Sequence, residues 1–437
     1  MVSLLPVVSG CGSTDGAPAA DDAATADVTA GDALDTSPPT DVPADVHTDV
    51  HTDAPDAPAL CPGDVLAPFE GGAAYYARWS HGPPSAPGFF PISVWLQSPG
   101  NAPRFAALGI NQYIGLYNGP SEGDLTTLTT GKMPALGDQN AVGLAHLSDP
   151  ILRGWTQQDE PDNAQPDGAG GYGPCVAPST IVASYAAWTG KDATRPVFLN
   201  FGRGAADTAW FGRGSACASK TDMYPQYAAG ADVLSFDIYP VNDAAGKEPP
   251  KLWMVAQGVD NIRGWADRKK PVWTWIETTA IDGAAKPTPA QLRMEVWSAV
   301  VHGALGIGYF VHQFKPAFSE AALLDDATTS AAVLEVDTQL GKLAPVLDTP
   351  SIANGVGVKT TDAAIPIDVM LKRFGGSTYL FAVGMRDGKN QATFTLSCVG
   401  KAAKAEVLGE SRTVDVTAGV LTDAFEPYAV HLYKIDP

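Results

Sequence analysis

The first 60 residues contain no lysine, arginine or aromatic residue. Residues 12–60 also lack glutamate, yet they hold eleven aspartates among Ala, Thr, Pro and Val. Without these aspartates the formal net charge of the chain would change from −20 to about −9. A segment with charges of one sign and no aromatic residue to nucleate a core is expected to be a disordered, self-repelling spacer. His47 and His51 are better explained as solvated spacer residues than as metal ligands, because a flexible segment would bear the whole cost of ordering.

An apolar stretch, Met1 to Gly10, precedes this spacer and ends in Val8-Ser9-Gly10-Cys11. It resembles a bacterial lipobox, in which Cys11 becomes the lipidated first residue of the mature protein. The absence of a basic residue before the stretch departs from that pattern, and an ordinary export signal or a chance cysteine is the alternative. We expect residues 1–11 to be a lipoprotein-type signal, which implies a protein that is lipid-anchored to a bacterial membrane outside the cytoplasm, or secreted.

Cysteine is scarce, with five residues in the chain. The four beyond Cys11 form an even set, which in an exported protein suggests disulfide bonds, although four cysteines allow three connectivities. We favour a bond between Cys175 and Cys217, which flank one predicted strand, and place Cys61 with Cys398 as the weaker second pair. A metal site is disfavoured, because no two cysteines are close in sequence and no histidine lies at ligand spacing.

Several motifs of other enzyme classes are missing. The chain has no P-loop and no H-E-x-x-H zinc helix, and no G-x-G-x-x-G loop follows its first strand-like segment. The acidic balance and the lack of a basic stripe disfavour binding to nucleic acid. We therefore expect no metal or other cofactor, no nucleic-acid partner and a monomeric protein.

Short β-branched or aromatic segments alternate with helix-like segments from about residue 88 to residue 345. Eight such units match the number that closes a (β/α)8 barrel, and a doubly wound open sheet, which usually needs fewer strands, is the alternative. Candidate helices are Ile181–Thr189, Lys251–Arg268 and Pro289–His302. The predicted strands are Ile92–Leu96, Gln112–Leu116, Met133–Leu136, Ile151–Thr156, Pro196–Phe201, Val233–Ile238, Val272–Ile276 and Gly306–Val311.

Beyond residue 345 the pattern changes to strands without intervening helices. The segments are separated by Gly, Asn and Asp turns, which is typical of an antiparallel β-sandwich. We predict a barrel domain over residues 61–345 and a sandwich domain over residues 346–437. The sandwich is expected to pack against the barrel, since it has few aromatic residues for binding carbohydrate. Its predicted strands are Asp368–Arg373, Thr378–Val383, Ala392–Leu396, Ala405–Leu408 and Ala429–Lys434.

Two glutamates close predicted strands of the barrel. Glu160 follows the fourth strand in Asp159-Glu160-Pro161, and Glu277 ends the seventh in Trp275-Ile276-Glu277. The active site of a (β/α)8 barrel lies at the carboxyl ends of its strands, and side-chain alternation places Glu277 on the same face as Trp275. Glycoside hydrolysis needs such a pair, because one carboxyl group protonates the leaving oxygen while the other attacks the anomeric carbon or activates water.

This arrangement resembles the clan A glycoside hydrolases, retaining (β/α)8 enzymes with an acid/base glutamate after strand four and a nucleophilic glutamate after strand seven. The resemblance covers about residues 88–345 and implies that Glu160 is the acid/base and Glu277 the nucleophile. Asp159 departs from the clan, which usually has an asparagine there, and an ionised aspartate can only accept hydrogen bonds. The structural alternatives are that Glu160 belongs to a helix start and that Glu277 pairs with a basic residue such as Arg293.

The remaining strand ends carry aromatic and polar residues suited to lining a sugar site. Each could equally be a core or rim residue. We expect Tyr239 to touch the nucleophile, because its strand neighbours the one that carries Glu277. The function predicted is a retaining glycosidase acting on extracellular poly- or oligosaccharide, and the alternative is a non-catalytic carbohydrate-binding surface lipoprotein on a degenerate barrel. The predicted substrate-binding residues are Trp95, Asn118, Gln158, Asp159, Asp237, Tyr239, Trp275 and His312.

Overall fold

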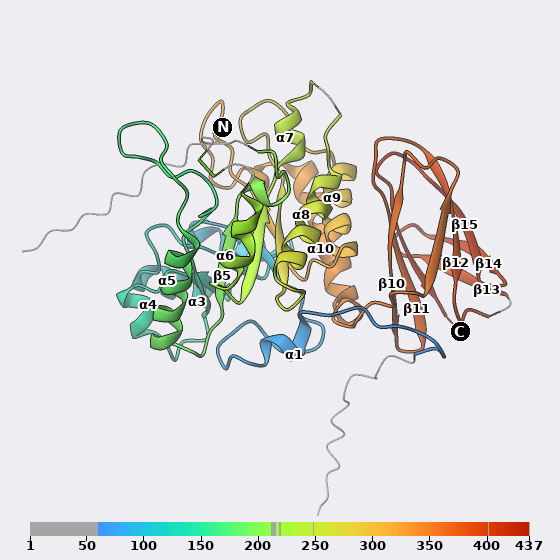
Figure 1. Ribbon diagram of the computed structural model, residues 1–437, viewed down its shortest axis with the longest axis horizontal. Coiled ribbons are helices and arrows are strands. Elements are labelled where there is room, and N and C mark those ends of the chain that lie inside the picture. Colours follow the sequence, from blue (N-terminus) through green and yellow to red (C-terminus); the bar gives the residue numbers. More distant parts are fainter. Residues whose placement is uncertain (1–59, 211–215, 218–219, 248, 401, 437) are drawn as a thin grey trace, which may run out of the picture. The chain divides into compact units, whose positions relative to one another are not determined.

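The computed structural model describes residues 60–210, 216–217, 220–247, 249–400 and 402–436 (Figure 1). The predicted lipidation site at Cys11 and most of the predicted spacer lie outside these residues. Within the described part of the chain, none of the helices combines the length and the apolar character needed to cross a bilayer.

Eight parallel strands form a closed barrel, which confirms the predicted fold class. Each strand pairs with the next one along the chain, and β1 pairs with β8 to close the ring. Every strand overlaps its predicted range. The strands are β1 (Ile92–Trp95), β2 (Gln112–Ile114), β3 (Ala135–Gly137), β4 (Leu152–Thr156), β5 (Val197–Phe201), β6 (Val233–Asp237), β7 (Val272–Glu277) and β8 (Ile307–Phe310).

Helices connect the strands, and their ends follow local sequence signals. Ser121 and Asp124 form a capping box at the start of α3, and Thr288 and Gln291 do the same for α9. The three predicted helices correspond to α5, α8 and α9, whereas the longest helix, α10, was not predicted. The helices are α1 (Gly72–Tyr76), α2 (Ala102–Ala106), α3 (Glu122–Gly131), α4 (Ala141–Ala145), α5 (Pro178–Lys191), α6 (Tyr224–Ala228), α7 (Pro240–Ala244), α8 (Trp253–Trp265), α9 (Pro289–Val301) and α10 (Ala327–Leu347). Short 3-10 turns lie at Pro99–Asn101, Arg203–Ala205, Thr221–Met223 and Ala322–Asp325.

The barrel interior is filled by large side chains. Trp273 and Trp275 on β7 pack there with Phe198 of β5, in one cluster of buried residues. Gly308 on β8 makes room for this packing, because a Cβ atom at that position would lie 2.3 Å from the Trp275 ring. Alternate residues of β7 therefore face the interior, as the sequence pattern predicted.

The C-terminal part of the chain is one antiparallel sheet of eight strands in the order β10-β11-β16-β13-β14-β15-β12-β9. This confirms the predicted antiparallel second domain and adds three strands to the five predicted. The strands are β9 (Val356–Thr360), β10 (Ile367–Phe374), β11 (Ser377–Gly384), β12 (Asn390–Leu396), β13 (Ala402–Val407), β14 (Arg412–Thr417), β15 (Val420–Phe425) and β16 (Val430–Ile435). The three strands that were not predicted, β9, β14 and β15, have many exposed or partly exposed side chains, so their sequences give a weak apolar signal.

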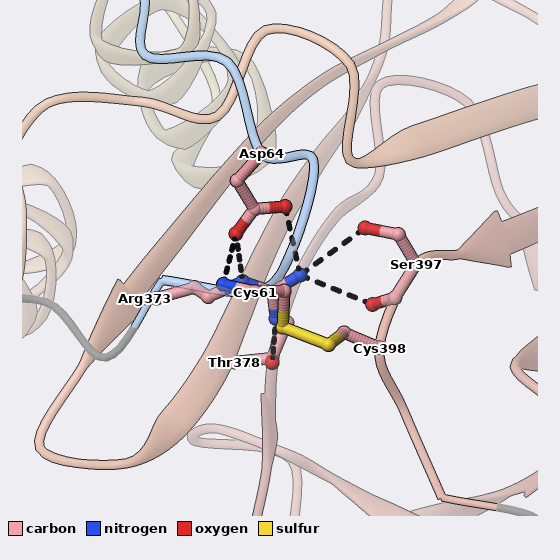
Figure 2. Close-up of a disulfide and its surroundings, with 6 residues drawn as sticks. All are labelled: Cys61, Asp64, Arg373, Thr378, Ser397 and Cys398. Atoms are coloured by element: carbon pink, nitrogen blue, oxygen red, sulfur yellow. Dashed lines mark hydrogen bonds and ion pairs between the residues drawn. A yellow bond between two sulfur atoms is a disulfide. The ribbon is translucent and has the colours of Figure 1, made fainter.

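Apolar and covalent contacts join this sheet to the rest of the chain. The Trp297 ring of α9 stacks on Phe381 of β11, with ring centroids 5.5 Å apart. A disulfide joins Cys61 to Cys398, and the buried ion pair of Asp64 with Arg373 lies beside it (Figure 2). The second disulfide joins Cys175 to Cys217. Both predicted pairs of cysteines are thereby confirmed.

Candidate active site

The carboxyl ends of β4, β5 and β6 bring two aspartates together through one asparagine. Asn200 of β5 donates from Nδ2 to Asp159 Oδ1 at 2.9 Å and to Asp237 Oδ1 at 3.3 Å. The two carboxylate oxygens can therefore be no further apart than the sum of these distances. Both aspartates are partly exposed. Sequence reasoning named the aspartates as substrate-binding residues but missed Asn200, which no motif marks.

The barrel interior fixes the orientation of the Asn200 side chain. Its Oδ1 accepts hydrogen bonds from Trp275 Nε1 at 2.9 Å and from Ser235 Oγ at 2.7 Å. Because an indole N–H can only donate, Oδ1 must face Trp275, and the amide N–H groups must face the aspartates. The tryptophan inside the barrel thus sets which atom of Asn200 is presented at the mouth.

Tyr239 lies two residues beyond the end of β6 and joins this cluster. Its hydroxyl group interacts with Asp237, and burial together with the negative charges of Asp237 and Asp159 raises the pKa of Tyr239 well above its usual value. The phenol therefore stays protonated at neutral pH and acts as a hydrogen-bond donor. The mouth of the barrel offers two carboxylates with an amide and a hydroxyl as donors between them.

Glu160 lies next to this cluster and has an unusual backbone. Its φ angle is +43°, a left-handed conformation that is rare for residues other than glycine. Its backbone N–H donates to Asn200 O at 3.1 Å, and its carbonyl oxygen accepts from Gln165 Nε2 at 3.0 Å. Its Oε1 lies 3.0 Å from where a Cβ atom at Gly202 would be, so the side chain packs over that glycine after β5.

Left-handed backbone recurs at this end of the barrel. Leu96, directly after β1, has φ +43°, and Asn118, shortly after β2, has φ +61°. Each such residue costs about 1–3 kcal/mol, and this kind of strain is concentrated at functional sites. Three such residues follow barrel strands on this rim, and the other eight non-glycine residues with positive φ among the described residues lie at helix ends and in turns of the C-terminal sheet, so this backbone conformation does not mark the site by itself.

Glu277 is buried, unlike Asp159, Glu160 and Asp237, which are partly exposed. Its side chain is fully buried, and its carboxylate accepts hydrogen bonds from the backbone N–H groups of Val241 at 2.6 Å and Asn242 at 2.9 Å, and from Asn242 Nδ2. These donors belong to α7, which follows β6. A substrate could therefore reach Glu277 only if the start of α7 moved.

A second buried glutamate lies beside Glu277. The carboxyl group of Glu295, on α9, is also fully buried and interacts directly with that of Glu277. Apart from this pair interaction, neither Glu295 oxygen has a hydrogen-bond partner among the described residues. Burial raises the pKa of Glu277 to about 7 and that of Glu295 further, because Glu295 also faces the charge of Glu277 and lacks the α7 donors. The pair therefore holds a proton more readily on Glu295 than on Glu277.

Aromatic residues occupy the side of the mouth formed by β8, β1 and β2. The rings of Tyr239 and Phe310 lie 5.0 Å apart, and those of Phe310 and His312 also lie 5.0 Å apart. Phe314 and Phe318 continue the group, and Phe318 is 60% exposed. Sequence reasoning named Tyr239 and His312 but missed the two phenylalanines, because they lie in a loop beyond the strand end.

The other predicted substrate-binding residues fall into two groups, one that contacts aromatic residues at the mouth and one that is exposed. Trp95 packs edge-on against Trp275 at 5.1 Å, and His312 is buried with Nε2 3.0 Å from the Tyr117 hydroxyl. Burial lowers the pKa of His312 to about 4, so the ring is neutral at physiological pH. Asn118 and Gln158 are both exposed at the rim.

One further motif lies between β2 and α3, where the expectation from sequence that the chain has no G-x-S-x-G motif is wrong. Gly119-Pro120-Ser121-Glu122-Gly123 matches the G-x-S-x-G pattern of serine hydrolases. Ser121 Oγ, however, donates to Asp124 Oδ2 at 2.6 Å and accepts from the Asp124 backbone N–H at 3.2 Å, as the N-cap of α3. The contacts of Ser121 are those of a helix cap rather than of a serine–histidine pair.

Comparison with known proteins identifies the fold. No family model matches the chain, and no curated protein matches it. Among solved structures, a catalytic mutant of Gan42B, a GH42 beta-galactosidase from G. stearothermophilus, matches with a TM-score of 0.53 and 9% identity over 79% of this chain and 98% of that one. AmyP in complex with maltose matches with a TM-score of 0.50 and 8% identity over 84% of this chain and 98% of that one. Sequence identities this low show a shared fold alone. The predicted resemblance to clan A glycoside hydrolases is thus confirmed for the fold.

Proposed function

We propose that the protein is a glycoside hydrolase that cleaves poly- or oligosaccharide at the carboxyl-terminal mouth of its barrel. The observation that carries this proposal is the pair of partly exposed aspartates, Asp159 and Asp237, that share the amide of Asn200. Carboxylates this close, beside aromatic rings, suit a sugar ring that needs both hydrogen-bond acceptors and an apolar face. The fold shared with known glycosidases supports the reaction class.

Glu160 is proposed as the acid/base. It would protonate the departing glycosidic oxygen and, in a retaining mechanism, later deprotonate the water that releases the sugar. Its packing over Gly202 and its left-handed backbone support this role, since both hold the carboxyl group in a defined place at the mouth. Asp159, directly before it, would accept hydrogen bonds from sugar hydroxyl groups.

The second carboxylate has two candidates. Glu277 is the nucleophile that the sequence pattern predicts, and it can act only if α7 moves away from it. Asp237 needs no such movement, because it is partly exposed and receives hydrogen bonds from Asn200 and Tyr239. The Asn200 bridge also brings Asp237 close to Asp159, the residue directly before Glu160.

Three variants separate these roles on any polysaccharide that the wild type hydrolyses. Glu160→Gln should lose about 10²- to 10⁴-fold in turnover, the usual contribution of a general acid or base. A comparable loss in Asp237→Asn, with activity kept in Glu277→Gln, would assign the second carboxylate to Asp237. The opposite result would restore Glu277. Glu426→Gln, whose side chain is 70% exposed in the C-terminal sheet, is the matched control.

One observation favours a second candidate function. The full burial of Glu277 behind α7 is what a degenerate barrel that binds carbohydrate without cleaving it would have. Binding of a polysaccharide with no release of reducing ends, and with no change in affinity on Glu160→Gln, would establish that function.

We also propose that the protein acts outside the cytoplasm, held to a membrane through lipid on Cys11. The two disulfides support an oxidising location. Cell fractionation of the wild type and of Cys11→Ser tests the anchor. The variant should move from the membrane fraction to the soluble one, and an unchanged distribution would refute the anchor.

A further inference from the structure

Aromatic rings form a continuous line from the aspartates to the protein surface. Tyr239, which interacts with Asp237, contacts Phe310 with ring centroids 5.0 Å apart. Phe310 is followed by Phe314 at 6.4 Å, and Phe314 by Phe318 at 5.8 Å. From Phe310 outward the exposed fraction rises, from 7% at Phe310 to 60% at Phe318. The line thus begins at the proposed reaction centre and ends in solvent.

The loop that carries the last two rings is held in place. Gln313 and Ser319 exchange two backbone hydrogen bonds of 2.9 Å, which close the loop into a small hairpin. Glu320, next to it, accepts from Ser98 Oγ at 2.9 Å and from Asn101 Nδ2 at 3.0 Å, on the β1 side of the mouth. The exposed Phe318 ring is therefore presented by an anchored loop and not by a free one.

Phe318 has a large apolar side chain that would be more stable when buried, because burying a Phe contributes about 1.5–3 kcal/mol to the free energy of folding. Phe318 is not an isolated apolar residue, because it continues a row of rings with Phe314 and Phe310, and contiguous apolar surface is what marks a ligand site. Tyr117, 39% exposed, adds a hydroxyl group nearby through its contact with His312, whose ring lies 6.3 Å from that of Phe318. Apolar faces with hydroxyl partners match the two sides of a pyranose ring.

We propose that Phe314 and Phe318 form a stacking subsite for an uncharged pyranose unit of the same saccharide chain, beyond the unit held at the aspartates. This inference rests on the proposed function, since it takes the aspartates as the place where the chain is bound. It predicts that the protein acts on chains of several sugar units and that affinity increases with chain length. A single sugar would leave the subsite empty.

The test compares Phe318→Ala with a control at Tyr172, another exposed aromatic residue, 45% exposed in the loop after β4. Oligosaccharides of increasing length, from the polysaccharide that the wild type binds or hydrolyses, are titrated by calorimetry into the wild type, Phe318→Ala and Tyr172→Ala, each carrying Glu160→Gln so that the ligand is not cleaved, and hydrolysis is measured with Glu160 in place. Phe318→Ala should weaken binding of the long oligosaccharides about 2- to 10-fold, the size of one aromatic contact, and leave binding of the monosaccharide unchanged. Phe318→Trp should restore or strengthen the long-chain affinity.

The outcomes distinguish this inference from the proposed function. Equal affinities of the wild type and Phe318→Ala at every chain length would overturn the subsite, and hydrolysis by both would leave the proposed function intact. Binding that is weakened by Phe318→Ala, without hydrolysis in any variant, would support the subsite and overturn the enzymatic proposal. Self-association of the wild type that is abolished in Phe318→Ala, with carbohydrate binding unchanged, would assign the ring to a contact between copies and overturn the subsite.

Discussion

The buried pair of Glu277 and Glu295 should make the stability of the protein depend on pH in a defined direction. Both carboxyl groups are fully buried, and both pKa values are raised, that of Glu277 to about 7 from the ordinary 4.5. Between these pH values the folded protein keeps protons that the unfolded chain has released. The free energy of unfolding contributed by the pair is therefore greatest below about pH 4.5 and declines as the pH increases toward 7.

Glu295→Gln is the informative perturbation. The glutamine amide can donate a hydrogen bond to the Glu277 carboxylate as a protonated Glu295 does, but it has no titrating proton, so the variant lacks the proton that the folded wild type retains on Glu295. One proton retained by the folded state corresponds to about 1.4 kcal/mol per pH unit. Between pH 5 and pH 7 the wild type should therefore lose up to about 3 kcal/mol more stability than Glu295→Gln.

Urea unfolding at pH 5, 6 and 7, followed by tryptophan fluorescence, measures this difference. Asp337, Asp162 and Asp348 also have raised pKa values, but they are present in both proteins, so the comparison isolates the glutamate pair. Glu426→Gln, an exposed carboxylate, should have the slope of the wild type. An identical pH slope in the wild type and Glu295→Gln would refute the reasoning, because it would mean that the pair holds no extra proton.

Two further predictions concern the mouth and the disulfides. Gly202→Ala should reduce kcat/KM by up to about 10²-fold, since the added methyl group would lie 2.4 Å from Asn163 Nδ2 and 3.0 Å from Glu160 Oε1 and displace both side chains; wild-type kinetics in the variant would contradict this placement of Glu160. Cys61→Ser should lower the free energy of unfolding by up to about 5 kcal/mol, because the bond to Cys398 closes a loop with a sequence separation of 337. Cys175→Ser opens a loop with a separation of 42 and should cost less in urea unfolding, so an equal or larger loss there would argue against loop closure as the cause.

The sequence was sufficient to predict the barrel and the identity of its interior side chains. Alternation along β7 placed Trp275 inside, because strand periodicity is a local property. It could not predict the surroundings of Glu277. Two of the donors that cover its carboxylate are the backbone N–H groups of Val241 and Asn242, and such groups carry no sequence signal.

The site itself was predicted only in part, because some of the contacts that form it leave no local signal in the sequence. Asp159 and Asp237 were recognised because they follow strands, but the residue that joins them, Asn200, lies within β5 and was not distinguishable from a core residue. Phe318 was missed because its neighbours in space depend on how the loop after β8 folds back to Ser319. Contacts between residues on different strands and loops arise from tertiary structure, which neither composition nor spacing encodes.

The most direct test of the central claim is the release of reducing ends from a panel of polysaccharides by the wild type and by Glu160→Gln. The account predicts release from at least one polysaccharide by the wild type, and a loss of about 10²- to 10⁴-fold in a variant that remains folded. Equal release by the two proteins, or no release from any polysaccharide, would contradict a glycosidase active site at this mouth.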